Sequence, residues 1–217
     1  MGNQPSAAGR IPLVVKLAFT AFMGVMVPAY LYFYGPANFL YFCDVAMLLT
    51  LAAVWTEKPL FAGMAAVGIL VPQTIWVIDF LGGFCGIHRT GMTDYMFKGA
   101  GALSLFKRGL SLFHGWLPFF LLYLVYRLGY DRRSLAAWTV LATVLLLICY
   151  FLLPMGPAPE ANKDLPVNVN YVFGMDDNKP QEWMPRPAWL AVLLFGMPVL
   201  FYLPVHLTLS RLAPRST

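Results

Sequence analysis

Three ionisable side chains lie inside stretches of this chain that are otherwise strongly apolar. They are Asp44, Asp79 and His114. An aspartate at the centre of a transmembrane helix costs about 2.5–3.5 kcal/mol on insertion scales, so a membrane protein keeps such a residue where it is paired or used. A histidine with carboxyl groups nearby suits general acid–base chemistry, because a carboxyl group can fix the imidazole tautomer. We therefore look for function around these residues.

Two residues beside this set carry nucleophilic atoms. Cys43 lies next to the first aspartate, and Ser111 lies one helical turn before His114. In a hydrolase or acyltransferase, His114 would be the general base for Cys43, and one of the two aspartates would orient the imidazole ring. Cys43 would need His114 close by, because the thiolate is the reactive form. A hydroxyl group, of Ser111 or of Thr50, is the alternative nucleophile.

Further residues are candidates for binding a substrate. Asn168 and Asn170 carry amide groups that can stabilise an oxyanion. Other candidates share a helical face with an ionisable residue or follow the two asparagines directly. These predicted contacts are Tyr41, Trp76, Ser111 and Tyr171.

A metal or haem site is a separate hypothesis for the same residue types. Asp44, Asp79, His88 and His114 could all ligate iron or zinc. The chain has no H-E-x-x-H or comparable spacing, and His88 lies in a Gly-rich loop that is poorly suited to holding a haem. The sequence therefore predicts neither a metal nor another cofactor.

The elements that must position these residues are membrane-spanning helices. The chain is 59% hydrophobic and 12% charged, with a mean hydropathy of +0.67, which is typical of polytopic membrane proteins rather than soluble domains. We predict an all-α fold, with six transmembrane helices in one bundle that forms a single domain over residues 1–217. The predicted spans are 11–34, 36–55, 59–85, 109–129, 134–154 and 187–211.

Turn residues and loop composition predict how the helices are connected. Tight turns at Gly35-Pro36 and Glu57-Lys58-Pro59 predict that the first three helices are antiparallel neighbours. Two longer loops, 86–108 and 155–186, remain on the other connections. Because they are rich in Gly, Asn and aromatic residues, we expect parts of both to fold back into the protein. Residues 98–109 are predicted to be a short interfacial amphipathic segment.

The distribution of Lys and Arg predicts the orientation. With a cytoplasmic N-terminus, the inside segments carry eight basic residues against two acidic ones, whereas the outer loops carry seven against six. The positive-inside rule therefore places both termini in the cytoplasm. With six predicted spans, we expect a multi-pass protein of the cell or inner membrane. The formal net charge of +5 is explained by anionic lipid, and no nucleic-acid partner is predicted.

Helix rise then gives the depth of each ionisable residue. At 1.5 Å per residue, Asp44, Asp79 and His114 lie roughly 12, 9 and 8 Å from the outer ends of their helices. We therefore predict one polar cluster in the outer half of the bundle, beneath the two loops. His206 lies near the cytoplasmic end of the last span, where a structural role is expected.

Three short segments resemble a known family. They read N-F-L-Y-F-C-D at 38–44, F-H-G-W-L-P-F at 113–119 and N-V-N-Y-V-F-G at 168–174. Together with the six-span order, they resemble the androgen-induced (ADTRP-like) integral membrane proteins and the bacterial YwaF-like membrane proteins. The resemblance implies a lipid ester hydrolase with a threonine nucleophile on helix 2 and a histidine on helix 4. His114 matches that histidine, whereas the threonine position falls near Tyr41, so Cys43 would have to replace it.

Two functions follow from these observations. The first is an intramembrane lipid ester hydrolase or acyltransferase that uses His114. The second is a non-enzymatic subunit, or an assembly, lipid-binding or pigment-binding protein of a larger membrane complex, which the aromatic content would suit. Membrane lipids are the expected partners in both cases, with protein partners added in the second.

Overall fold

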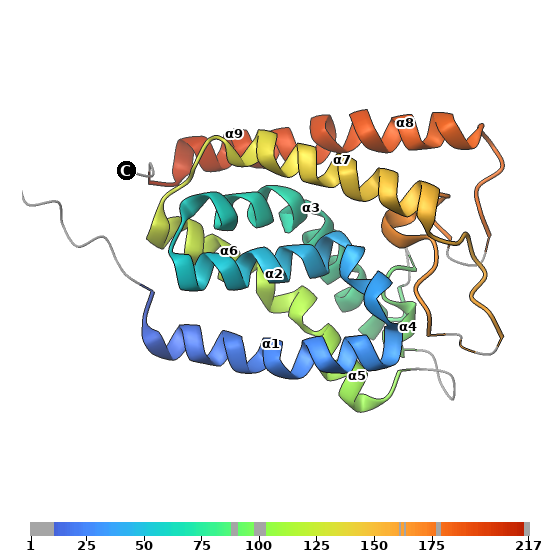
Figure 1. Cartoon of the computed structure of the whole chain (residues 1–217), viewed down its shortest axis with the longest axis horizontal. Coiled ribbons are helices and arrows are strands. Elements are labelled where there is room, and N and C mark those ends of the chain that lie inside the picture. The colour runs from blue at the N-terminus through green and yellow to red at the C-terminus, as the bar shows by residue number, and fades with distance from the viewer. Residues whose placement is uncertain are drawn as a thin grey trace, which may run out of the picture.

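The protein folds into a helical bundle (Figure 1). The computed structural model describes residues 11–87, 91–97, 103–160, 162, 164–176 and 179–214, and within this part no β-strand is present. In chain order the elements are α1 (Leu13–Tyr34), η1 (Pro36–Leu40), α2 (Phe42–Thr56), α3 (Pro59–Phe84), α4 (Asp94–Phe97), α5 (Leu105–Ser111), α6 (Phe113–Leu128), α7 (Ser134–Leu152), η2 (Val169–Tyr171), α8 (Arg186–Met197), η3 (Pro198–Tyr202) and α9 (Leu203–Leu212).

Five helical segments are long and apolar enough to cross a membrane. They are Leu13–Tyr34, Pro59–Phe84, Leu105–Leu128, Ser134–Leu152 and Arg186–Leu212. Each agrees with a predicted span to within a few residues. The remaining apolar helix, α2, has only 15 residues, which is about 22 Å of helix against a hydrocarbon core of about 30 Å.

The second predicted span, 36–55, is not one continuous helix. Its first part is the 3₁₀ helix η1, and Tyr41 then adopts an extended conformation before α2 begins at Phe42. The break is held from outside, because the Phe42 N–H donates to the Asn170 side-chain oxygen at 2.9 Å. A partner more than a hundred residues away therefore decides where α2 starts.

Helix α3 lies at the centre of the bundle and contacts α2, α6, α7 and α9. Its first half is rich in small residues, and every residue from Ala62 to Ile69 is buried. A Cβ atom at Gly68 would overlap the indole of Trp138 on α7, and one at Gly63 would overlap the Ser134 side chain. Small residues of this kind let membrane helices approach closely, since lipid provides no hydrophobic drive for helix association.

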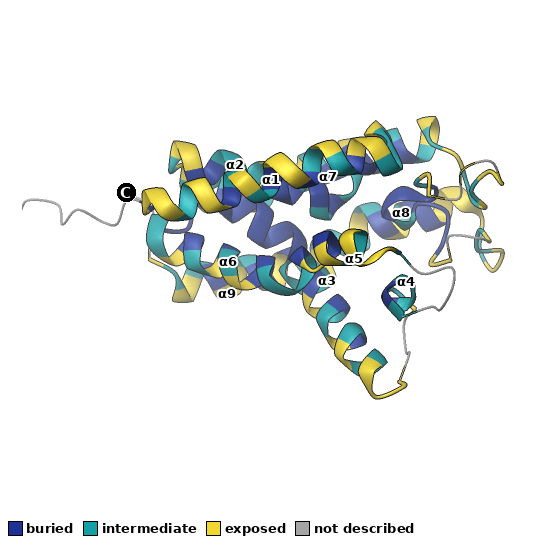
Figure 2. Cartoon of the chain, turned by 90° about the horizontal axis from the view of Figure 1, so that it is seen from below, coloured by how far each residue is buried: buried dark blue, intermediate teal, exposed yellow. Residues whose placement is uncertain are grey.

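The last turns of α3 leave the bundle beside α4, as Figure 2 shows. Ile78, Leu81 and Phe84 are 64%, 59% and 70% exposed there. The opposite face of the same turns stays buried through Trp76 and Asp79. This part of α3 therefore has one face toward the protein and one face toward its surroundings.

The two ends of the bundle differ in their connections (Figure 1). The start of α1, the α2–α3 and α6–α7 turns and the end of α9 share one end, and the longer loops share the other. At the first end the Tyr130 hydroxyl lies 2.8 Å from Nδ1 of His206, which gives that histidine a structural partner. At the second end, Val167, Asn168 and Val172 of the predicted loop 155–186 are buried. This part of the loop therefore folds into the protein, as its composition predicts.

Candidate polar site

His114 is fixed by the backbone of the preceding helix. It lies at the second position of α6, just after the break at Leu112 that separates α5 from α6. The Gly115 N–H donates to the Leu112 carbonyl at 2.9 Å in a 3₁₀ pattern, which leaves the Ser111 carbonyl for the His114 ring. Nδ1 of His114 lies 2.8 Å from that oxygen. A carbonyl only accepts, so the neutral ring carries its proton on Nδ1 and a lone pair on Nε2.

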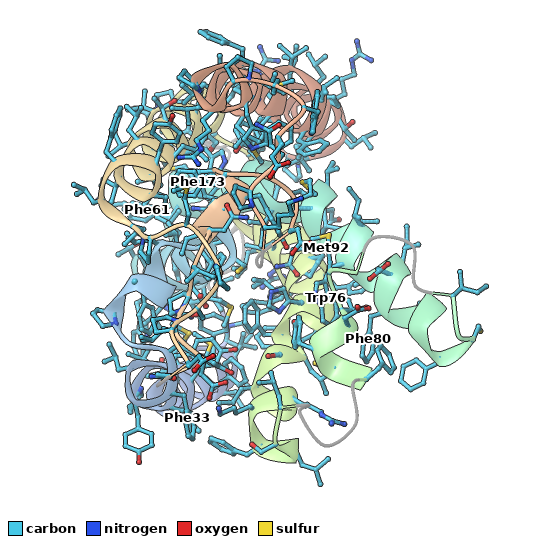
Figure 3. All side chains as sticks on the ribbon, turned by 90° about the vertical axis from the view of Figure 1, so that its right-hand side faces the viewer. Phe33, Phe61, Trp76, Phe80, Met92 and Phe173 are labelled. Carbon is cyan, nitrogen blue, oxygen red and sulfur yellow. The ribbon has the colours of Figure 1, made fainter. Side chains whose placement is uncertain are left out.

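The imidazole ring is held between two aromatic rings. The Trp76 ring stacks on it with centroids 4.9 Å apart, and the Phe113 ring stacks at 4.1 Å. Trp76 is in turn oriented by its Nε1–H, which donates to the Tyr95 hydroxyl at 3.1 Å. Figure 3 shows Trp76 toward the interior of the bundle and Phe80 farther out on the same helix. Among the residues that the structure describes, Nε2 of His114 has no hydrogen-bond partner.

Asp44 has one carboxylate oxygen fixed and one without a partner. It lies in the first turn of α2 and is 2% exposed. Oδ2 accepts from the Asn38 amide at 2.8 Å, whereas Oδ1 is buried and has no hydrogen-bond partner among the described residues. A continuous helix over 36–55 would place Asp44 a full turn or more below the start of the helix. Because α2 begins at Phe42, Asp44 lies in its first turn. It lies instead at the positive end of the helix dipole.

Tyr30 and Ser111 connect the Asp44 region with the His114 region. The Tyr30 hydroxyl interacts with the Ser111 hydroxyl and lies within electrostatic range of Asp44 and Cys43. Ser111 also interacts with the Tyr95 hydroxyl, which lies within range of Cys43. These contacts bring residues of α1, α2, α4 and α5 into one polar cluster. Burial raises the pKa of the Tyr95 phenol, so this group remains protonated and can donate a hydrogen bond.

Asp79 belongs to a neighbouring contact. Its Oδ2 accepts from both the backbone N–H and the hydroxyl of Thr93, at 3.2 and 2.8 Å. Both residues are almost fully buried, so this pair ties residues 91–97 to α3. Asp79 lies one helical turn from Trp76, whose ring stacks on His114. In the described part of the chain, no direct hydrogen bond joins the two aspartates and His114.

The two predicted oxyanion donors are occupied by the backbone. The Asn168 amide donates to the carbonyls of Gly174 and Asp176, and its oxygen accepts from the Phe173 N–H. Asn170 donates to the Leu40 carbonyl at 2.8 Å, in addition to capping α2. Both residues have positive φ angles, which asparagine tolerates better than most residues. Their amides hold the loop to the bundle, and we do not assign them to substrate binding.

The other predicted contacts are spread over this loop and the helices near it. The Tyr41 hydroxyl lies 3.5 Å from the Val167 carbonyl, and the Tyr171 carbonyl accepts from Nε1 of Trp189. The Thr50 hydroxyl donates to the Ala46 carbonyl within its own helix, which gives it a structural role. Cys43 is a free thiol. Of the candidate nucleophiles, Cys43 and Ser111 lie in the polar cluster.

Sequence reasoning missed four residues of this region: Tyr30, Asn38, Tyr95 and Thr93. Tyr30 and Tyr95 resemble the interfacial aromatics that membrane proteins carry at helix ends, so their type gave no signal. Asn38 is six residues from Asp44, and a break in the predicted helix would have been needed to bring the two together. Thr93 lies in a loop whose position depends on α3.

A metal centre gains no support from the described residues. In that part of the chain, no three His, Cys, Asp or Glu side chains lie close enough together to hold a metal ion. His88, which completed the metal hypothesis, lies outside the described residues.

The chain matches no family model, no curated protein and no solved structure in the comparisons with known proteins. Function must therefore be argued from the cluster itself.

Proposed function

We propose that this protein is a multi-pass integral membrane protein with six spans and both termini in the cytoplasm. Five apolar helices of sufficient length support the membrane setting. The sixth span would consist of η1 and α2 together, because α2 alone is short. The start of α1 and the end of α9 lie at the same end of the bundle (Figure 1), which suits an even number of crossings. The basic turns at that end favour the cytoplasmic side.

We further propose that the polar cluster acts on lipid esters, as a hydrolase or an acyltransferase. The observation that carries this proposal is the state of two groups in the cluster. His114 is half-buried, with Nδ1 anchored on a carbonyl and Nε2 left for other contacts, and Asp44 is buried, with Oδ2 anchored and Oδ1 unpartnered among the described residues. A buried polar atom without a partner, such as Oδ1 of Asp44, is costly, and in a native structure it calls for a ligand or a chemical role.

Each residue then has a chemical task. Nε2 of His114 takes the proton from the nucleophile, which is the Cys43 thiol, the Ser111 hydroxyl or a water molecule, and returns it to the departing alcohol. The Tyr95 hydroxyl, which accepts from Trp76, has its own proton left to donate to the developing oxyanion. Asp44 supplies a second acid–base group in the same cluster. The aromatic rings around His114 hold the imidazole in one orientation.

The decisive test is the turnover of lipid esters by the purified protein. His114→Gln should lower the turnover by about 100-fold or more, because general-base groups contribute about 10²–10⁴-fold. His206→Gln is the matched control, since that histidine contacts Tyr130 at the other end of the bundle, and it should keep near-normal turnover. Full activity of His114→Gln would refute the catalytic role.

A non-enzymatic subunit is the second candidate, and the outer part of α3 favours it. Ile78, Leu81 and Phe84 form an apolar face that stands away from the bundle (Figure 2). Such a face suits contact with lipid or with helices of a partner. Stoichiometric co-purification of another membrane protein that is lost in Leu81→Ser would support this function. It would be excluded by a monodisperse monomer that is active on lipid esters.

A further inference from the structure

A hollow at the loop end of the molecule shares no lining residue with the polar cluster of Tyr30, Cys43, Asp44, Tyr95, Ser111 and His114. Its volume is about 380 Å³, and its lining includes Met175, Lys179, Gln181, Glu182, Trp183 and Trp189. This volume lies within the range of about 300–1,000 Å³ that is typical of small-ligand sites. Its lining residues come from the segment between η2 and α8 and from Trp189 in the first turn of α8.

One wall of the hollow is rigid. Nε1 of Trp189 donates to the Tyr171 carbonyl at 2.8 Å, and its ring is only 8% exposed. The Gln181 side chain exchanges two hydrogen bonds with the Met184 backbone, and its backbone N–H donates to the Phe173 carbonyl. Residues that are already fixed lose little entropy when a ligand binds.

The other wall is exposed and free to adjust. Trp183 is 71% exposed, and its ring lies edge-on to Trp189 with centroids 5.8 Å apart. Lys179 and Glu182 are 3.6 Å apart, with side chains that are 68% and 75% exposed. A solvent-exposed pair at this distance contributes little stability, so both side chains can turn to a ligand at small cost.

These side chains suit a ligand that carries both charges. The exposed indole of Trp183 can attract a cation over its face, most strongly a weakly hydrated ammonium group. Glu182 and Asp176 add negative charge to the lining, and Lys179 offers an ammonium to a phosphate. A phosphate linked to an ammonium by a short spacer is the arrangement found in zwitterionic phospholipid headgroups.

The surface below the hollow fits the rest of such a lipid. One turn after Trp189, an apolar stripe begins on the outer face of the last span. Val192, Phe195 and Val199 on this stripe are 47%, 73% and 60% exposed. A headgroup in the hollow would therefore place its acyl chains along this stripe, within the hydrocarbon region.

The geometry points to a headgroup site for phosphocholine or phosphoethanolamine lipids at the outer end of α8. This inference rests on the membrane setting and is independent of whether the polar cluster is catalytic. Failure of ester turnover would leave it intact, and its own failure would not affect the test of His114.

The test measures lipid binding to the purified full-length protein. Short-chain phosphatidylcholine, phosphatidylethanolamine and phosphatidylglycerol are titrated separately, and bound lipid is counted by native mass spectrometry. We expect the two zwitterionic lipids to bind about tenfold more tightly than phosphatidylglycerol, with the preference lost in Trp183→Ala. Trp183→Phe should keep most of it, since a phenyl ring retains the cation–π contact. Trp183 is largely exposed, so its replacement should not impair folding.

Trp55→Ala is the matched control, because Trp55 is a partly exposed tryptophan whose Nε1 donates to Thr20, far from the hollow. It should leave the preference unchanged. Equal affinity of the wild type for all three lipids, or an unchanged preference in Trp183→Ala, would overturn the inference. Free phosphocholine is titrated as a separate arm. Binding as tight as that of the lipid would support the headgroup chemistry and assign a soluble ligand as its source.

Discussion

The two halves of α3 lie in one helix and do different work. From Ala62 to Ile69 every residue is buried, and small side chains let α7 pack directly against the helix. Beyond Pro72, burial is restricted to one face that carries Gln73, Trp76 and Asp79. The first half holds the bundle together by close packing, and the second half presents polar and aromatic groups to the site.

The comparison shows how an apolar helical bundle can keep polar groups. Close packing of the first half gives a frame that does not depend on the polar residues. The second half can then retain an unpartnered buried atom, Oε1 of Gln73, that would otherwise only destabilise the fold, and the neighbouring helix α2 likewise retains Oδ1 of Asp44. If stability and function divide in this way, substitutions in the two regions should have different effects.

The largest loss of stability is expected in the first half, from Gly68→Ala. The added Cβ would overlap the buried Trp138 ring, and overpacking of this kind costs about 3 kcal/mol. The melting temperature of the purified protein in detergent, followed by circular dichroism, should fall clearly.

Gly24→Ala is the control for that variant, because no atom lies within 4 Å of the position that its Cβ would occupy. It should be at least as stable as the wild type, since alanine favours a helix by about 1 kcal/mol over glycine. Equal losses in the two variants would show that α3 and α7 are not closely packed at Gly68.

A smaller loss is expected from Asn170→Ala. This substitution removes the cap of α2 and leaves the Phe42 N–H and the Leu40 carbonyl without their partner, at a cost of about 2 kcal/mol. Thermal unfolding measures the effect. Asn162→Ala is the control, because Asn162 is exposed and should cost at most about 0.5 kcal/mol. A stable Asn170→Ala protein would mean that α2 starts at Phe42 without outside help.

Asp44→Asn should change stability by less than about 1 kcal/mol while abolishing function. An asparagine can keep the bond to Asn38 through its amide oxygen, and the other oxygen of Asp44 has no partner to lose. Melting temperature and ester turnover should be measured on the same preparation. A large loss of stability would identify Asp44 as structural and would contradict the separation of a close-packed frame from the polar site.

The smallest effect is expected in the turn between α6 and α7. Hydrogen bonds and charge from Arg133 hold the pKa of the Asp131 carboxyl below its usual range. A lowered pKa stabilises the fold above the unfolded-state value, and this contribution is lost as the pH falls from about 4 through the folded-state value. The melting temperatures of the wild type and of Asp131→Asn should be measured across this pH range. The difference between them should become small at the lowest pH. A constant difference would contradict the pair.

The positions of the helices could be predicted from the sequence, whereas their breaks could not. Apolar runs and turn residues gave the ends of α1, α3 and α7 closely, because each span needs a minimum length of apolar chain. The break at Tyr41 depends on a tertiary contact, since Asn170 caps the helix that follows it, and the local sequence does not contain that partner. The break at Leu112 has a local partner, because the His114 ring occupies the Ser111 carbonyl three residues earlier.

The candidate site shows the same limit. The types of Asp44, Asp79 and His114 marked them as unusual, since charge is costly in an apolar span. Their partners could not be predicted, because Tyr30 and Asn38 are ordinary residues for their segments. The even depth of the three residues suggested direct contact. In the described structure, intermediates connect them instead, with Trp76 between Asp79 and His114.

The sequence by itself determined that the chain is helical and suited to a membrane, because hydropathy and length are properties of each segment alone. It also determined which residues are costly enough to need an explanation. Only the tertiary structure decided which atoms of those residues are satisfied. That depends on how helix breaks and loops place the partner groups, and one carbonyl or one amide decides whether an atom is anchored or left open to a ligand.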